Sequence, residues 1–225
     1  MCLFNVRATL SVLLLFFALH CQAGIVIGGT RLIFHGDKKE ASLSVSNPDK
    51  VPYLIQSWLE TQQGSSAKSE FLVTPPLFRL DGGQKNLLRV EAIGSLPQDK
   101  ETLFWFNIKA IPSSQKNENA LKIAVKNRIK MIYRPASLNS QDPEALAAKL
   151  SWQRNGGTLT VNNPTPFYMN FMYIRMSGEL IPSATYVAPH ASASFTLPGK
   201  MRGNDIRWAL ITDYGGSGKE HQTSL

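Results

Sequence analysis

The chain has 225 residues, of which 43% are hydrophobic, 9% aromatic and 18% charged. This apolar share excludes a disordered chain, and 16 glycines with 13 prolines exclude collagen-like and low-complexity sequences. The formal net charge of +8 favours an anionic partner but does not specify its kind. The length fits one large all-β domain or two domains of about 100 residues each.

Residues 1–23 have the features of a secretory signal peptide. Arg7 supplies a positive amino-terminal region, an apolar run extends from Leu10 to Leu19, and Ala23 provides a small residue before a cleavage point. The run is shorter than the ~20 residues of a membrane span, and the bulky residue before Cys21 disfavours a lipoprotein. We therefore expect export with cleavage after Ala23, no membrane insertion, and a mature chain without cysteine.

Short segments that alternate apolar and polar residues dominate the rest of the chain. Gly, Pro, Asn and Asp separate them, and this pattern predicts β-strands. Eight segments precede Pro135 and six follow it, so we expect two β-sandwiches. The expected strands are 25–34, 41–46, 53–60, 71–74, 77–80, 85–90, 103–110, 121–133, 150–154, 158–162, 168–176, 185–188, 193–197 and 206–212.

A short helix is expected between the two sets of strands. Asp142 is a favourable N-cap residue and Pro143 suits the first helical position, so the helix should extend over 144–150. We interpret it as a linker helix without a chemical role.

The segment 121–133 is unusually long for a strand. Its odd positions are mostly apolar, and Lys and Arg occupy most of its even positions. Thirteen extended residues span about 43 Å, whereas strands usually have about 5–6 residues. Part of the apolar row should therefore overhang the sandwich or lie on an edge, which natural proteins avoid unless the edge is used. The alternative is a long core strand with a solvated basic face.

Motifs for catalysis and for metal binding are not found in the sequence. The mature chain has three histidines, His35, His190 and His221, and none has a metal-ligand spacing. The glycine-rich stretch 215–219 fails both the phosphate-loop and the nucleophile-elbow patterns. The basic row lacks the aromatic stacking platform of single-strand binders. We expect no catalytic residue, metal or cofactor and no nucleic-acid partner.

Six segments, in order along the whole mature chain, carry a specific pattern. They are 29–34 (GTRLIF), 74–78 (TPPLF), 96–107 (LPQDKETLFWFN), 119–135 (NALKIAVKNRIKMIYRP), 163–168 (NPTPFY) and 212–215 (TDYG). Together these segments resemble periplasmic pilus-assembly chaperones of the chaperone–usher pathway, and the nearest relatives resemble type 1 and P-pilus chaperones. Only 111–119 connects the last two strands of the first domain, as in the short-loop subclass.

The resemblance implies two immunoglobulin-like β-sandwich domains set at an angle, with a cleft between them. The boundaries are then 24–136 for the domain with the donor strand and 137–225 for the second domain. Such chaperones act in the periplasm, bind pilus (fimbrial) subunits that lack their final strand, fold and cap them by donor-strand complementation, and deliver them to an outer-membrane usher without ATP. A monomer or a 1:1 complex with a subunit is expected.

The resemblance also implies the residues of the donor strand. Leu121, Ile123 and Val125 lie on one face and would fill successive pockets of the subunit groove. Ile129 and Met131 are expected to belong to the core of the chaperone itself.

Two charged sets follow from the same resemblance. Arg31 and Lys130 would bind the subunit's C-terminal carboxylate, and Glu101, Arg134 and Asp213 would form a charge network between the domains. The alternative for the first pair is two ordinary surface cations.

A cis peptide bond is considered at Pro75-Pro76.

The rival hypothesis is a structural β-sandwich protein, either a pilus subunit or an adhesin. The second complete domain and the lack of a cysteine pair in the mature chain argue against it. The two hypotheses differ in the size of the purified protein, because a pilus component should polymerise.

Overall fold

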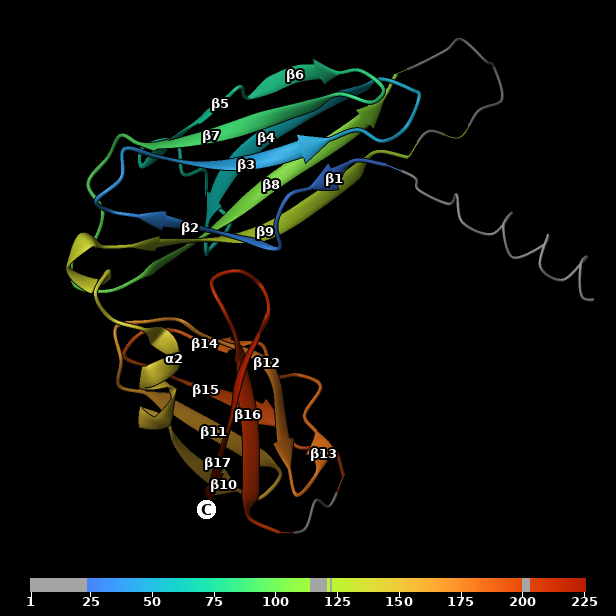
Figure 1. Ribbon diagram of the computed structural model, residues 1–225. Helices are drawn as coiled ribbons and strands as arrows, with labels where there is room; N and C mark the ends of the chain where they lie inside the picture. Colours follow the sequence, from blue (N-terminus) through green and yellow to red (C-terminus); the bar gives the residue numbers. More distant parts are fainter. Residues whose placement is uncertain (1–23, 114–120, 122, 200–202) are drawn as a thin grey trace, which may run out of the picture.

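The computed structural model describes residues 24–113, 121, 123–199 and 203–225. The expected signal peptide, residues 1–23, lies outside them. The described chain forms two β-sandwiches that lie one above the other, joined by a segment that contains α2 (Figure 1). The expectation of an all-β chain with two sandwiches is confirmed.

The first sandwich packs a four-stranded sheet on a five-stranded sheet, and Val45, Phe106 and Met131 are fully buried between them. The four-stranded sheet has the order β1 (Val26–Ile27), β3 (Glu40–Ser46), β7 (Lys85–Ala92), β5 (Phe71–Thr74). The five-stranded sheet has the order β2 (Arg31–His35), β9 (Val125–Arg134), β8 (Thr102–Pro112), β4 (Tyr53–Thr61), β6 (Leu77–Leu80).

The first expected strand, 25–34, is divided between the two sheets. β1 pairs with β3 in one sheet, whereas β2 runs parallel to β9 in the other. The chain changes sheet at Gly28, whose N–H donates to the Ser44 carbonyl at 2.8 Å. A Cβ atom at Gly28 would collide with the Ser44 hydroxyl, so glycine allows the close approach at this turn. The change of sheet places Arg31 beside β9.

The second sandwich has its own core, in which Trp152, Phe171 and Trp208 are buried. One sheet has the order β10 (Ser151–Asn155), β11 (Thr158–Asn163), β15 (Ala191–Thr196). The other has the order β13 (Glu179–Leu180), β12 (Met169–Met176), β16 (Asp205–Ile211), β17 (Ser217–Ser224), with β14 (Tyr186–Val187) paired to β12.

Strand β17 was not expected from the sequence. Its residues are polar and mostly exposed or partly exposed, because β17 is an edge strand that pairs only with β16. The alternation of apolar residues that predicts a half-buried strand is therefore weak there. The glycine-rich stretch 215–219 is the turn into this strand and its first residues.

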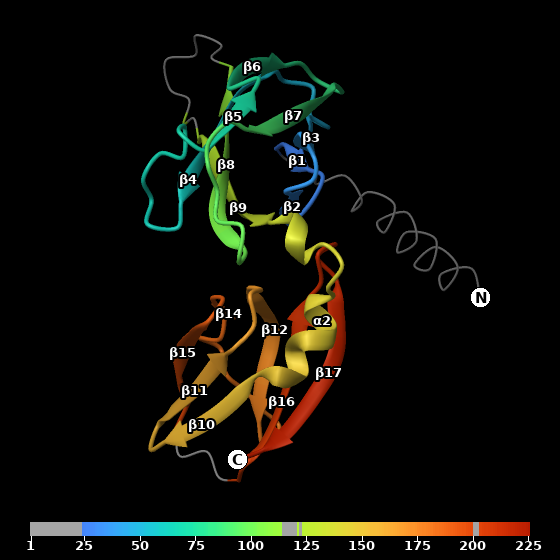
Figure 2. The ribbon, with the colours of Figure 1, turned by 90° about the vertical axis from the view of Figure 1, so that its left-hand side faces the viewer.

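The connecting segment contains η1 (Ala136–Leu138), α2 (Pro143–Leu146) and η2 (Ala147–Lys149). As predicted, Asp142 caps α2, and its side chain accepts a hydrogen bond from the Glu144 N–H at 2.9 Å. The α-helix ends at Leu146 instead of continuing to residue 150. The Glu144 carboxylate in turn accepts the Lys219 N–H at 2.9 Å, so α2 is held beside β17 (Figure 2).

The long strand begins later than expected, at Val125 instead of residue 121. β8 pairs with β9 up to Ala110 opposite Val125, and the same register would place Pro112 opposite Ile123. Proline has no N–H to donate, so the ladder cannot continue regularly there. Leu121 and Ile123 therefore lie outside the regular strand.

The cis peptide bond lies one position before the one considered. It joins Thr74 to Pro75, not Pro75 to Pro76.

Candidate functional site

The first half of β9 is a sheet edge. β2 pairs only with residues 130–134 of β9, whereas β8 pairs with all of β9 from Val125 to Tyr133. The side of β9 that faces away from β8 therefore has no described strand beside residues 125–129. Such an edge offers unpaired backbone groups to another chain.

The apolar row at this edge is exposed. The exposed fraction is 90% for Leu121, 66% for Ile123 and 51% for Val125. Further along, Ile129 packs against the core of the first sandwich and Met131 is fully buried, as predicted. The row therefore divides into an exposed part and a part that belongs to the core.

Arg31 and Lys130 are neighbours on adjacent strands. They are register partners in the parallel pair of β2 and β9. Both reach the second sandwich, because Arg31 Nη1 donates to the Ile211 carbonyl at 3.2 Å and Lys130 Nζ donates to Asn170 Oδ1 at 2.5 Å. The fold thus places two cations where the sandwiches meet.

These two cations have unused hydrogen-bonding capacity. Within the described part of the chain, neither has a carboxylate within salt-bridge distance, and Arg31 Nε is buried without a hydrogen-bond partner. Burial and the neighbouring Arg31 cation lower the pKa of Lys130 to about 8. Burial also lowers the pKa of Arg31, although the more distant Asp213 and Glu101 oppose this shift. A bound anion would stabilise the charged forms of both side chains.

A hollow of about 350 Å³ opens beside the pair. Its described lining carries no carboxylate side chain, and cations stand beside apolar groups in it. The lining residues are Thr30, Arg31, Trp105, Arg128, Ile129, Lys130, Met172, Ile211 and Gly215. This composition suits a carboxylate attached to an apolar group.

A second charged group, close by, is fully paired. Arg134 Nε donates to Glu101 Oε1 at 2.8 Å, and its two terminal nitrogens donate to the Asp213 carboxylate at 2.6 and 2.8 Å. The other Glu101 oxygen accepts the Tyr168 N–H at 2.7 Å. Since Glu101 and Arg134 belong to the first sandwich and Asp213 and Tyr168 to the second, this network bridges the two.

Glu101 and Arg134 are buried, whereas the Asp213 side chain is 35% exposed, and burial opposes the charges of the first two. Glu101 is 3% exposed and Arg134 5%. Burial raises the pKa of Glu101, which the Arg134 cation counteracts. Burial also opposes the charged form of Arg134, but the hydrogen bonds and charges of Asp213 and Glu101 outweigh it and raise its pKa.

Asp213 lies in the hairpin between β16 and β17, which places it in contact with Arg134. In Figure 1 this hairpin points from the lower sandwich towards the upper one. Its turn closes with a hydrogen bond from the Gly215 N–H to the Thr212 carbonyl at 2.9 Å. Gly215 has a φ of +85°, and a Cβ there would collide with the Thr30 hydroxyl, so this position favours glycine twice over.

The residues that surround the cations were not expected from the sequence. Lys126, Arg128 and Lys130 lie over the rings of Trp58, Trp105 and Tyr186 at 4.9, 4.4 and 4.1 Å from the ring centroids. Asn170, which accepts from Lys130, was also missed. None of these partners has a spacing in the sequence that marks it, because the contacts join different strands and, for Lys130, different sandwiches.

No group of three or more His, Cys, Asp or Glu residues that could hold a metal ion is found among the described residues. In the same part of the chain, no helix is long and apolar enough to cross a membrane.

Family models match both sandwiches. The model described as "Pili and flagellar-assembly chaperone, PapD N-terminal domain" matches residues 24–139. The model described as "Pili assembly chaperone PapD, C-terminal domain" matches residues 145–222. Together these matches cover most of the chain.

Individual proteins give the same result. The chain is 39% identical over 211 residues to the chaperone protein FocC of Escherichia coli, covering 91% of this chain and 92% of FocC. It is 40% identical over 200 residues to the chaperone protein FimC of Escherichia coli K12, covering 86% of this chain and 81% of FimC.

Among solved structures, the chain is similar to the SafB chaperone in complex with the SafA pilin of Salmonella enterica. The TM-score is 0.84 at 38% identity, covering 92% of this chain and 98% of that chain. The Escherichia coli chaperone DraB has a TM-score of 0.81 at 35% identity, covering 90% and 96%.

These matches favour a chaperone over a pilus subunit or an adhesin. Each sandwich matches its own domain of the same two-domain chaperone family, and the matches cover between 81% and 98% of the length of the chaperones named above. The chain belongs to the pilus-assembly chaperone family.

Proposed function

We propose that this chaperone binds a pilus subunit between its two sandwiches and along the edge of β9. The subunit would add its edge to residues 121–129 and receive Leu121, Ile123 and Val125 in its groove. Its C-terminal carboxylate would bind Arg31 and Lys130. The chaperone would then deliver the subunit to an outer-membrane usher. This function consists of binding and release, and it requires no catalytic residue.

The exposed apolar row supports the donor-strand part of this proposal. The groove of an incomplete subunit would offer apolar surface and unpaired backbone groups, both costly in water. Each of the three side chains could contribute about 1.5–3 kcal/mol if fully buried in the complex. Backbone pairing along the free edge would add directional bonds that fix the register.

The observation that carries the proposal is the contrast between the cations. Arg134 is fully paired with carboxylates, whereas Arg31 and Lys130, only a few residues away on β2 and β9, have no carboxylate in contact within the described chain. A carboxylate bound by both would form charge-assisted hydrogen bonds, which are stronger than neutral ones. Anchoring the end of the subunit would also prevent a one-residue slip, which would turn Leu121, Ile123 and Val125 of the chaperone away from the subunit groove.

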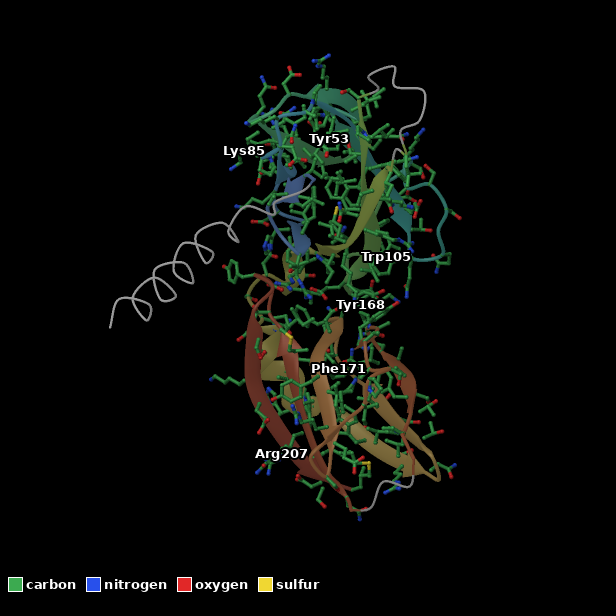
Figure 3. All side chains as sticks on the ribbon, turned by 90° about the vertical axis from the view of Figure 1, so that its right-hand side faces the viewer. Tyr53, Lys85, Trp105, Tyr168, Phe171 and Arg207 are labelled. Atoms are coloured by element: carbon green, nitrogen blue, oxygen red, sulfur yellow. The ribbon has the colours of Figure 1, made fainter. Side chains whose placement is uncertain are left out.

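A co-purification experiment tests the proposal. The chain is expressed in the periplasm with a panel of pilus subunits, each with its natural C-terminus or with a short C-terminal extension. We expect natural subunits to co-purify in a 1:1 complex and extended ones to be lost. Lys85→Ala, on β7 (Figure 3), is the control for Arg31→Ala and Lys130→Ala. Equal recovery of natural and extended subunits would contradict the carboxylate anchor.

The cellular and domain assignments belong to the same proposal. Residues 1–23 support export to the periplasm, and the relative SfaE is described as a periplasmic chaperone. We place the domain boundary at 136/137, within η1 of the connecting segment and two residues after the end of β9. The free chaperone is proposed to be a monomer, which size measurement on the purified protein would test.

A further inference from the structure

The ammonium group of Lys130 lies against an aromatic ring of the other sandwich. Its Nζ is 4.1 Å from the centroid of the Tyr186 ring, and it donates to Asn170 Oδ1. An ammonium group has three N–H donors. One is used by Asn170 and the ring faces the group from another side, so the remaining capacity can serve a bound carboxylate.

Tyr186 is itself held in place. Its hydroxyl accepts a hydrogen bond from Gln62 Nε2 at 3.0 Å, and Gln62 Oε1 accepts one from the Tyr168 hydroxyl at 3.2 Å. The rings of Tyr168 and Tyr186 are 5.9 Å apart. Both ends of a single amide of the first sandwich thus bind two tyrosines of the second. Figure 3 shows Trp105 and Tyr168 at the facing ends of the two sandwiches.

The two cations that precede Lys130 on β9 have different contacts. Lys126 and Arg128 lie over Trp58 and Trp105, which belong to their own sandwich, and both are within 4 Å of the Glu60 carboxylate. Lys130 takes its ring from the second sandwich and has no carboxylate in contact within the described chain. Its position therefore depends on how the two sandwiches meet.

We propose that Tyr186, fixed by Gln62 and Tyr168, is a positioning residue that holds the Lys130 ammonium beside Arg31 in its charged form. The face of an aromatic ring attracts a cation, and more strongly where water is excluded. The anchor for the subunit is then complete only when both sandwiches are in contact. The ligand in this inference rests on the proposed function, whereas the contact between ring and cation does not.

A titration of the free protein tests the contact. The Lys130 side chain is followed by NMR in the wild type, Tyr186→Leu, Tyr186→Phe and the control Tyr173→Leu, whose native hydroxyl binds Glu220 instead. We expect Tyr186→Leu to lower the pKa of Lys130 by about one unit, equivalent to ~1.4 kcal/mol. Tyr186→Phe retains the ring and should shift the pKa much less. An unchanged pKa in Tyr186→Leu would overturn the inference.

A double-mutant cycle tests the positioning role. Binding of a co-purifying pilus subunit should weaken about tenfold in Tyr186→Leu but less than about twofold when the same change is made in a Lys130→Met chain. Tyr186→Phe should bind better than Tyr186→Leu. Equal losses in both backgrounds would show that Tyr186 does not act through Lys130. If no subunit binds the wild type, the proposed function fails, while the titration still decides the inference.

Discussion

Two regions of the long alternating segment, residues 121–127 and residues 130–134, differ in their surroundings more than in their sequence. Along Lys130–Arg134, β2 lies on one side of the strand and β8 pairs on the other side up to Tyr133. Met131 is buried there, and the Arg134 side chain forms ion pairs with Glu101 and Asp213. The apolar residues Leu121, Ile123 and Val125 follow the same alternation in the sequence, but their side chains are exposed. One alternating pattern can therefore belong to a core or face a partner, depending on whether a strand lies beside it.

The paired end of β9 should be the most sensitive to substitution in the free protein. Glu101→Ala removes one partner of buried Arg134 and leaves the Tyr168 N–H without its acceptor. We expect a loss of about 3 kcal/mol in the free energy of unfolding, because a buried charge loses part of its compensation. Urea unfolding of the purified variant measures it.

Glu60→Ala provides the matched control for that change. The Glu60 side chain is 19% exposed, and it pairs with Lys126 and Arg128, whose side chains are each 42% exposed and open to solvent. Exposed pairs contribute less than about 1 kcal/mol. Similar losses in Glu60→Ala and Glu101→Ala would contradict a special role for the buried network.

The exposed end of β9 should show the opposite behaviour. Ile123→Asp places a carboxylate in the proposed subunit groove, where it has no partner, and should abolish co-purification of the subunit. The free protein should melt almost normally, because Ile123 is 66% exposed. Ile93→Asp is the matched control, since Ile93 is 58% exposed and distant in sequence. An Ile123→Asp protein that fails to fold would support the core-strand alternative instead.

Lys130 lies at the junction of the two regions and should affect binding rather than folding. Lys130→Ala removes a charged hydrogen-bond donor worth about 1.5–3 kcal/mol, which corresponds to a loss in affinity of about 10- to 150-fold. Calorimetry with a natural subunit measures this loss. The effect should largely vanish with a subunit whose C-terminus is extended, and persistence of the full loss there would exclude the carboxylate as the partner.

The pH dependence of binding should be the mildest effect near neutrality. The pKa of Lys130 in the free protein is lowered to about 8, and the bound carboxylate requires the ammonium form. Affinity should be constant below pH 8 and fall by up to tenfold per unit above it, until the raised pKa of the complex is reached. In Lys130→Arg the charge persists, so the affinity ratio of wild type to variant should fall above pH 8. A ratio independent of pH would contradict the proposal.

The sequence alone determined the class of fold. Period-two alternation and the turn residues predict most strands and the two sandwiches, because one face of each strand must be buried. The same reasoning failed for β17, a polar edge strand, and for the change of sheet at Gly28. Neither leaves an apolar pattern that a sequence can reveal.

The candidate site residues came from resemblance to a family, and their grouping required the tertiary structure. Arg31 meets Lys130 because β2 pairs in parallel with β9, and Arg134 meets Asp213 because the β16–β17 hairpin reaches the first sandwich. The environment of Lys130 depends still more on the fold, since Asn170 and Tyr186 come from the other sandwich. Such contacts join residues 40 or more positions apart, and no local propensity or spacing encodes them.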